Sequence, residues 1–370
     1  MKVLYVFHSL AIWGGIERIL VDKMNHLKTD FGYDVGILTT DQGSHAIPYQ
    51  LTDGIYVKDL GISFHLQYKH KGLRQLWERI KLAHRCELRM KEQIEAFQPD
   101  VIVCVATSMA DIAIKVSGKI PVVVESHSDF NHTFFGQKLI QRRRNWRLKR
   151  CLNQAQVIVA LTEGDASEWR KHYKNVKVIP NMVNLNQGSI SQQNSNHVIF
   201  VGRFDYQKLP TEAIEIWKLI QPDFPDWTLD IYGEGEEQEK VEQAALASGL
   251  KICIHKPTAR IFDCYRESTI LMMTSQFEPF GLVLPEAMSC GLPVVAYDCP
   301  YGPASIISQG TDGFLIKNND REAFAQQMKQ LMADRDLRLS VGKKAAESAK
   351  RFDARRIMPQ WKELFEKLCH

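Results

Sequence analysis

The sequence predicts an α/β protein made of two doubly wound domains, each with a parallel sheet covered by helices. Short apolar runs alternate with amphipathic stretches through most of the 370 residues. These runs are continuously apolar, which is typical of strands buried on both faces of a parallel sheet. A chain of this length also exceeds what one hydrophobic core usually serves, so two domains are expected.

The expected strands of the first domain are short and rich in Val and Ile. They lie at residues 2–8, 33–40, 99–106, 121–127, 155–162 and 176–180. The polar stretch NLNQGSISQQNSN follows them, lacks any periodicity and indicates a loop or an interdomain linker. We therefore expect the first domain to span residues 1–186.

A second set of strand-like runs begins after this linker. These runs lie at residues 197–204, 228–235, 251–255, 270–275, 293–298 and 313–316. Beyond residue 320 the pattern is helical only, and we expect the second domain to span residues 187–350. The amphipathic stretch 351–370 is expected to form a terminal helix that packs back on the first domain.

Charge and cysteine usage restrict the class of protein. The net charge of +4 divides into +8 for residues 1–190 and −4 for residues 191–370, which suggests that the first half faces an anionic partner. Eight cysteines without a Cys-x-x-Cys pair are typical of reduced, buried thiols in a cytoplasmic protein. No apolar run approaches the length of about 20 residues that spans a bilayer, and the apolar start is too short for a signal peptide.

The segment EPFGLVLPEAMSCGLPVVAYD carries the strongest chemical signal. Glu278 follows a buried strand, Gly281 allows close approach of a ligand to the backbone, and a helix is expected to run through Glu286. The amides of Phe280, Gly281 and Leu282 would then open that helix and offer a pocket for a phosphate. The alternative interpretation is a helix start with ordinary acidic residues.

The segment VGRFDYQKL places two cations just beyond another buried strand. Arg203 and Lys208, with four residues between them, can reach one pyrophosphate, the first as a fork and the second as a point charge. Taken alone, such a surface pair is more often solvated.

Two further candidates lie in the first half. Gly14 and Gly15 follow the first strand and open a helix, where glycine permits a tight turn and exposes amides to an anion. The third glycine of a dinucleotide fingerprint is missing. His127 ends the run at 121–127, just past its buried apolar part and in a position typical of a cleft, and Glu125 either orients it or points to the opposite side.

The two glutamates with seven residues between them, Glu278 and Glu286, resemble the mark of the GT4-like family of retaining glycosyltransferases. The resemblance implies the GT-B fold, with two Rossmann-like domains facing each other across a cleft. It also implies that Glu278 stabilises positive charge on the transferred sugar, and that Glu286 holds the ribose hydroxyls. Arg203 and Lys208 match the pair that neutralises the leaving diphosphate in this family, in place of a metal ion.

The first-half motifs fit the same resemblance in the same chain order. It places Gly14 and Gly15 near the donor phosphates and the acceptor, and His127 at the donor sugar. The resemblance implies a nucleotide-sugar donor, most simply a UDP-hexose or UDP-N-acetylhexosamine. It implies no cofactor and no metal, and a saccharide or polyprenyl-diphosphate-linked saccharide as acceptor, in bacterial surface-polysaccharide synthesis.

Two other functions stay open at this point. A catalytically silent sugar-nucleotide-binding protein would keep the cations without turnover, and a dinucleotide-dependent oxidoreductase would need the missing fingerprint. The basic stretches 69–91 and 139–150 fit either an anionic membrane surface, as in a peripheral enzyme on the inner face of the cell membrane, or solvated helices. Nucleic acid is not expected, because no recognition module is present.

Overall fold

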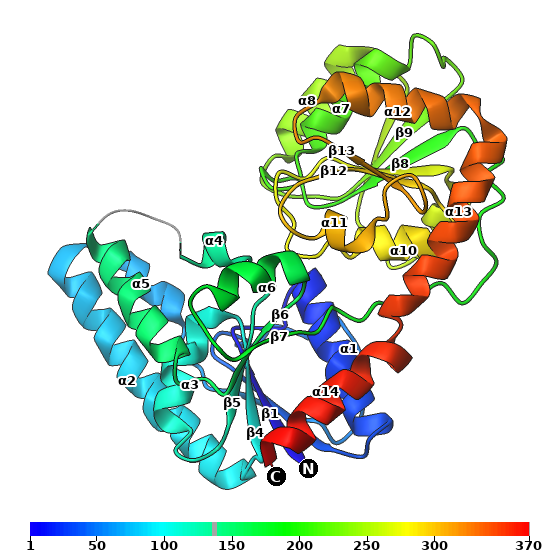
Figure 1. Cartoon of the computed structure of the whole chain (residues 1–370). Coiled ribbons are helices and arrows are strands. Elements are labelled where there is room, and N and C mark those ends of the chain that lie inside the picture. Colours follow the sequence, from blue (N-terminus) through cyan, green and yellow to red (C-terminus); the bar gives the residue numbers. More distant parts are fainter. Residues whose placement is uncertain (135–138, 370) are drawn as a thin grey trace. The chain divides into compact units, whose positions relative to one another are not determined.

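The structure is a computed structural model that describes residues 1–134 and 139–369, without the side chains of residues 139–141. The chain divides into two compact units, the first formed by Met1–Met182 with Ala354–His370 and the second by Val183–Asp353 (Figure 1). Each unit holds one fully parallel sheet, so the predicted doubly wound α/β fold is confirmed.

The first unit contains a seven-stranded sheet in the order β3-β2-β1-β4-β5-β6-β7. Its strands are β1 Lys2–Phe7, β2 Asp34–Thr39, β3 Tyr56–Asp59, β4 Val101–Val105, β5 Val122–Glu125, β6 Val157–Ala160 and β7 Val176–Val178. Its helices are α1 Gly15–Thr29, η1 Phe64–Lys69, α2 Gly72–Phe97, η2 Thr107–Met109, α3 Ala110–Val116, α4 Phe130–Thr133, α5 Leu139–Leu152, α6 Glu163–Arg170 and α14 Ala354–Cys369. The edge strand β3 was not predicted.

Two apolar layers cover the two faces of this sheet. On one face, side chains such as Ile102 and Val124 pack against helices α2, α3, α5 and α6. On the other, residues such as Val103 pack against α1 and α14. The terminal helix α14 therefore belongs to the core of the first unit, and its buried side chains include Trp361 and Phe365.

The second unit contains a six-stranded sheet in the order β10-β9-β8-β11-β12-β13. Its strands are β8 His197–Val201, β9 Thr228–Tyr232, β10 Ile252–His255, β11 Ile270–Met273, β12 Val294–Tyr297 and β13 Phe314–Ile316. Its helices are α7 Pro210–Ile220, α8 Gln238–Ser248, α9 Ile261–Glu267, α10 Val283–Ser289, α11 Pro303–Ile306, α12 Arg321–Ala333, α13 Arg335–Ala349 and η3 Lys350–Phe352. Helices α7, α8 and α12 share one apolar core with the sheet.

The boundaries between the units lie a few residues from those expected at 186 and 351. Val183 donates its N–H to the carbonyl of Phe352 over 2.9 Å, and the N–H of Asn186 is bonded to the Ser289 hydroxyl over 3.0 Å. Because these bonds tie residues 183–186 to elements of the second unit, the chain changes unit after Met182 and returns at Ala354.

The expectation of buried cysteines holds for half of them. All eight are free thiols; four are buried, two are half-buried, and Cys253 and Cys369 are exposed. Within the described ranges, none of the helices combines the length and the apolar composition that a bilayer crossing requires.

Candidate active site

The loops that carry the predicted cations and the first predicted glutamate follow neighbouring strands of the second unit. Arg203 and Lys208 come after β8, Glu278 comes after β11, and β8 and β11 are adjacent in the sheet. The strand order reverses between these two strands, because β9 lies beyond β8 and β12 lies beyond β11. Such a switch point, at the carboxyl ends of parallel strands, is where open α/β sheets bind ligands.

The loop after β8 is held by hydrogen bonds from its own residues and from the loop after β11. Asp205 accepts the backbone N–H groups of Gln207 and Lys208 over 3.1 and 2.9 Å. The N–H of Gln276 donates to the carbonyl of Gln207 over 2.8 Å, and the Thr274 hydroxyl donates to the carbonyl of Leu209 over 2.9 Å. The two loops therefore form one connected frame.

Lys208 and Glu278 meet directly in this frame. The Lys208 ammonium donates to Oε2 of Glu278, and these side chains are 18% and 7% exposed. Arg203 lies at the rim with a side chain 67% exposed, and its guanidinium is 3.1 Å from the Asp205 carboxylate. The structure thus brings Lys208 to Glu278 and leaves Arg203 directed toward solvent.

The turn before α10 departs from the expected helix start. Helix α10 begins at Val283, so Phe280, Gly281 and Leu282 precede it and do not form its first turn. Gly281 has φ +95°, a left-handed conformation that glycine adopts without strain, and a Cβ there would meet Cγ of Glu278 at 3.0 Å. The glycine is required because the backbone passes so close to the Glu278 side chain.

The second predicted glutamate is buried in α10. Glu286 is 3% exposed, and its Oε2 accepts a hydrogen bond from the hydroxyl of Tyr265 over 3.2 Å. Tyr265 is fully buried in α9. The second glutamate is therefore a buried carboxylate with a hydroxyl partner in the neighbouring helix.

In the first unit, His127 lies just beyond β5 and its side chain is only 4% exposed. Its Nε2 is 3.1 Å from Oε1 of Glu125, a fully buried residue at the end of β5. Oε1 of Glu125 also accepts a hydrogen bond from the ammonium of Lys23, which reaches it from α1. Of the two orientations left open for Glu125, the structure has the one that contacts His127.

The charges in this cluster act on one another. Burial alone would raise the pKa of Glu125, but the charges of Lys23 and His127 lower it to about 2. Burial lowers the pKa of Lys23, and the Glu125 carboxylate opposes that change. The Lys23 ammonium also lies 4.2 Å from the centroid of the Trp361 ring in α14. Sequence reasoning missed Lys23, because a lysine within an amphipathic helix is usually solvated.

Gly14 and Gly15 lie at the start of α1, as expected. Gly14 precedes the helix without any side-chain cap, and Gly15 is its first residue. A Cβ on Gly14 would lie 1.9 Å from Oε2 of Glu17, so the buried Glu17 side chain fills the space beside the glycine. The carbonyl of Gly14 accepts a hydrogen bond from the Tyr49 hydroxyl over 3.1 Å.

One group of side chains among the described residues has the ligand types of a metal site. The ligand atoms of Asp230, Cys253 and His255 lie within 4.8 Å of one another on β9 and β10. Both carboxylate oxygens of Asp230 already contact imidazoles, those of His197 and His255, over 2.6 and 2.7 Å. None of these side chains belongs to the predicted site.

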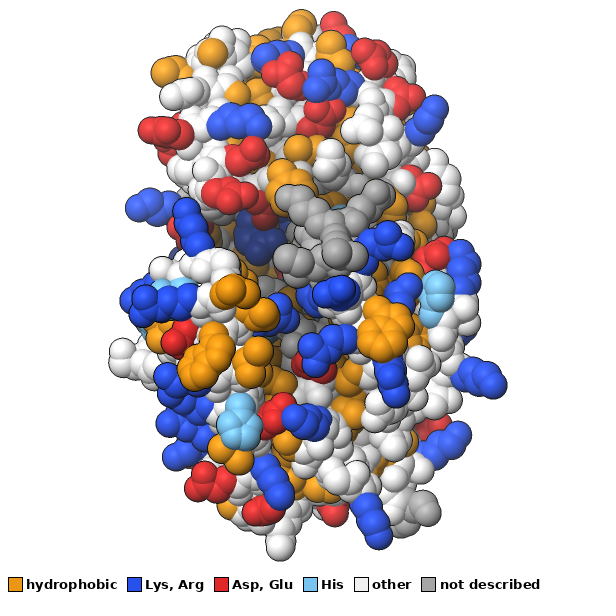
Figure 2. Space-filling model, turned by 90° about the vertical axis from the view of Figure 1, so that its left-hand side faces the viewer, with side chains coloured by type: hydrophobic (Ala, Val, Ile, Leu, Met, Phe, Trp, Pro, Cys, Tyr) orange, Lys and Arg blue, Asp and Glu red, His pale blue; other side chains and the backbone are white. Residues whose placement is uncertain are grey.

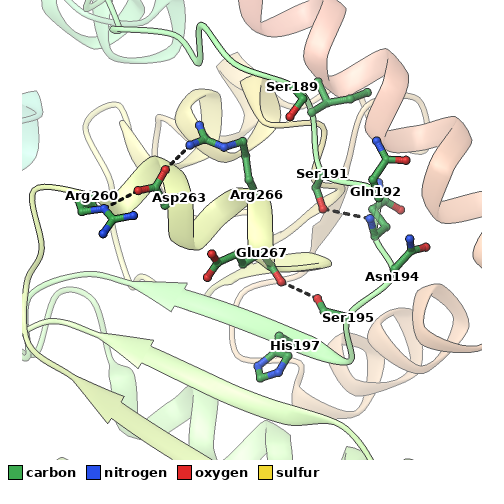
Figure 3. A pocket seen from close by; sticks show the side chains of 12 residues that line it. Ser189, Ser191, Gln192, Asn194, Ser195, His197, Arg260, Asp263, Arg266 and Glu267 are labelled. Carbon is green, nitrogen blue, oxygen red and sulfur yellow. Dashed lines mark hydrogen bonds and ion pairs between the residues drawn. The ribbon is translucent and has the colours of Figure 1, made fainter.

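A polar pocket of about 600 Å³ in the second unit also lies apart from the predicted site. Figure 3 shows it between the segment that precedes β8 and helix α9, with His197 at the first position of β8. Asp263 pairs with both Arg260 and Arg266 at its wall. The pocket is therefore at the amino end of β8, whereas Arg203 and Lys208 follow the carboxyl end.

Two family models match the chain and divide it much as the fold does. The model described as Glycosyltransferase Family 4 matches residues 13–187, and the model described as Glycosyl transferases group 1 matches residues 184–348.

Two curated relatives match over nearly their full length. The amylovoran biosynthesis glycosyltransferase AmsD of Erwinia amylovora is 26% identical, over 98% of this chain and 99% of its own. A Campylobacter jejuni protein is 22% identical, over 98% of both chains. It is named "GalNAc-alpha-(1->4)-GalNAc-alpha-(1->3)-diNAcBac-PP-undecaprenol alpha-1,4-N-acetyl-D-galactosaminyltransferase".

The fold resembles solved structures as well. The Anabaena protein HepE, solved in complex with UDP and glucose, superposes with a TM-score of 0.78 at 21% identity. The match covers 99% of this chain and 100% of the Anabaena chain.

Proposed function

Because the chain belongs to the glycosyltransferases that the group 1 and family 4 models describe, we propose that it transfers a sugar with retention of anomeric configuration. The donor is a nucleotide sugar, and the acceptor is a saccharide or a polyprenyl-diphosphate-linked saccharide in bacterial surface-polysaccharide synthesis. The observation that carries the proposal is the Lys208–Glu278 pair at the switch point of the second sheet.

The residues around this pair suit the parts of a nucleotide sugar. A buried carboxylate such as Glu286, held by Tyr265, can accept hydrogen bonds from two ribose hydroxyls. Lys208 and the exposed guanidinium of Arg203 supply positive charge for the diphosphate. The amides of residues 280–282 add neutral donors beside it. We propose UDP as the nucleotide, since the similar Anabaena structure holds UDP and glucose.

The chemistry follows from where charge develops. The bond between the anomeric carbon and the diphosphate oxygen breaks, while the acceptor hydroxyl oxygen bonds the same carbon on the same face. The acceptor proton passes to the leaving phosphate oxygen. Negative charge grows on the diphosphate, which Arg203 and Lys208 stabilise, and positive charge grows on the sugar, which the carboxylate of Glu278 stabilises.

The first unit supplies the remaining proposed residues. We assign His127 to the donor sugar, because it lies just beyond β5 at the carboxyl end of the first sheet, with its Nε2 3.1 Å from the Glu125 carboxylate. Gly14 and Gly15 are assigned to the donor phosphates and acceptor, since glycines at the start of α1 let a ligand approach the backbone closely. We place the enzyme in the cytoplasm, peripheral on the inner face of the membrane.

A catalytically silent sugar-nucleotide-binding protein is the alternative from another class. It would bind UDP through the same cations but release no UDP from a UDP-sugar when an acceptor is supplied. A dinucleotide-dependent oxidoreductase would instead bind a nicotinamide dinucleotide, but the glycine fingerprint after β1 is incomplete.

Binding of nucleoside diphosphates tests the proposal directly. Calorimetry is expected to show selective binding of UDP over GDP and ADP, and Lys208→Ala should weaken it by about 1.5–3 kcal/mol, as for a lost charge-assisted contact. Lys329→Ala is the matched control, because Lys329 pairs with Asp223 on the surface of the same unit. No binding of any diphosphate would refute the donor assignment, and unchanged affinity would refute the role of Lys208.

Chelation tests the assignment of the diphosphate charge to side chains. Transfer activity should stay largely intact in EDTA, because Arg203 and Lys208 provide the positive charge that a metal ion supplies elsewhere. The comparison should include Cys253→Ser, which removes one ligand type from the group of Asp230, Cys253 and His255. A loss of activity that a divalent ion restores in both proteins would contradict the assignment.

A further inference from the structure

The first turns of α2 carry an apolar stripe that the core of the first unit does not use. The buried residues of this helix begin only at Leu82. Before it, Leu73, Leu76, Trp77 and Ile80 are 86, 54, 69 and 60% exposed. Their spacing of three and four residues places all four on one side of the helix. A contiguous exposed stripe of large apolar side chains indicates an interaction surface, whereas single exposed residues are common.

Basic side chains surround this stripe. Residues 66–85 hold six lysines and arginines and a single acidic residue, Glu78. Those six are exposed: Lys69, Lys71, Arg74, Arg79, Lys81 and Arg85. The 3-10 helix that precedes α2 adds the exposed aromatic ring of Tyr68.

Helix α5 also combines exposed basic side chains with an exposed aromatic ring. Its described side chains from residue 142 to residue 150 include six lysines and arginines, no acidic residue, and Trp146 with 62% exposure. Arg143, Arg147 and Arg150 are all exposed, and their spacing of four and three residues places them on one side of the helix. Residues 139–141 also belong to the predicted basic run, but their side chains lie outside the described part of the structure.

One arginine of α2 and one of α5 act on the same side chain of α3. The carboxylate of Asp111 in α3 lies close enough to Arg79 of α2 and Arg147 of α5 for both charges to lower its pKa, against the dominant raising effect of burial. In Figure 2, which views the side of the first unit where α2 and α5 lie, hydrophobic and basic side chains gather next to one another in the lower part.

We propose that the exposed stripe of α2, with the cations of α2 and α5, docks the enzyme on a membrane rich in anionic lipid. Tryptophan and leucine side chains suit the boundary between headgroups and acyl chains, and long basic side chains beside them reach the lipid phosphates. Because only the later turns of α2 pack on the core of the first unit, its first turns can lie in the headgroup region with the helix axis along the membrane surface.

Charge complementarity decides between this occupant and an apolar protein groove. A groove in a protein partner would match the four apolar side chains but leave the surrounding cations unpaired, whereas an anionic bilayer satisfies both at once. Membrane docking deepens the proposed function and rests on it, because a polyprenyl-linked acceptor is held in a membrane. Its test needs no transfer reaction.

Flotation of the full chain with lipid vesicles tests the proposal. The protein should float with vesicles of phosphatidylglycerol and phosphatidylcholine, and the fluorescence of its tryptophans should shift to shorter wavelength. The double variant Leu76→Ser/Trp77→Ser should partition at least about tenfold more weakly. Leu246→Ser is the matched control, because Leu246 in α8 of the second unit is 85% exposed.

The charge component is tested in the same assay. Arg143→Ser/Arg147→Ser should weaken binding by about fivefold per arginine and reduce its dependence on salt. Absence of binding to anionic vesicles, equal binding to pure phosphatidylcholine, or unchanged binding of the Leu76/Trp77 variant would each overturn the proposal. UDP calorimetry on the same variants should be unchanged, so that failure of membrane docking is distinguished from failure of the donor site.

Discussion

Replacing Glu278 with Gln is expected to lower the turnover number by about 10²–10³-fold while the affinity for UDP changes little. The substitution keeps the shape of a side chain that is only 7% exposed and removes its negative charge. In the proposed mechanism that charge faces the sugar, where positive charge appears only as the bond to the diphosphate breaks. The loss therefore falls on the transition state and not on the bound donor.

The control for this variant must also break a partly buried ion pair in the same unit. Glu212→Gln meets that need, because Glu212 pairs with Arg321 and accepts a hydrogen bond from Tyr297 away from the candidate site. Steady-state kinetics of both variants, with melting curves to show that each is folded, separate a catalytic effect from a structural one. Full activity of the Glu278→Gln variant would remove Glu278 from the mechanism.

The strands and the loops that follow them could be predicted because each rests on a local pattern. Continuous apolar runs mark interior strands such as β4 and β11, because these strands are buried on both faces of a parallel sheet. Edge strand β3 gave no such pattern, since Tyr56, Val57 and Lys58 are exposed. Its pairing with β2 depends on the neighbouring strand and not on its own composition.

One part of the site escaped prediction because it depends on residues far apart in the sequence, and another because of a local turn. Lys23 looks like a surface residue of α1, yet it is 1% exposed, because Glu125 and the Trp361 ring meet it from β5 and α14. The motif around Glu278 identified Phe280 as part of a helix start. The left-handed Gly281, set against the Glu278 side chain, delays the helix to Val283.

The Lys23–Glu125 pair leads to the largest expected effect on stability. Lys23→Met should lower the free energy of unfolding by about 3–5 kcal/mol, because it leaves the fully buried Glu125 carboxylate without its main counter-charge. Urea unfolding at neutral pH measures this loss. The double variant Lys23→Met/Glu125→Gln should recover most of it, because no buried charge is left unpaired. Equal stability of the single and double variants would contradict this account.

The pH dependence of the unfolding free energy checks independently that the loss in the Lys23→Met variant comes from charge. In the native protein the pKa of Glu125 is lowered from 4.5 to about 2, so its contribution to stability is complete above pH 4.5 and is lost as the pH falls toward 2. Without Lys23, burial raises the pKa of Glu125. Protonation then removes the unpaired buried charge, so the variant regains stability as the pH falls. The difference in stability between native protein and variant should therefore shrink between pH 7 and pH 4. A difference that stays constant would show that packing, and not charge, is lost.

The double variant also separates the two roles of Glu125. Its carboxylate is 3.1 Å from Nε2 of His127, and glutamine in its place removes the charge that fixes the imidazole. If His127 acts on the donor sugar as proposed, a stable Lys23→Met/Glu125→Gln enzyme should still show lower turnover with little change in UDP affinity. Wild-type turnover in that stable variant would mean that the cluster only holds α1, β5 and α14 together, and that His127 does not need its carboxylate partner.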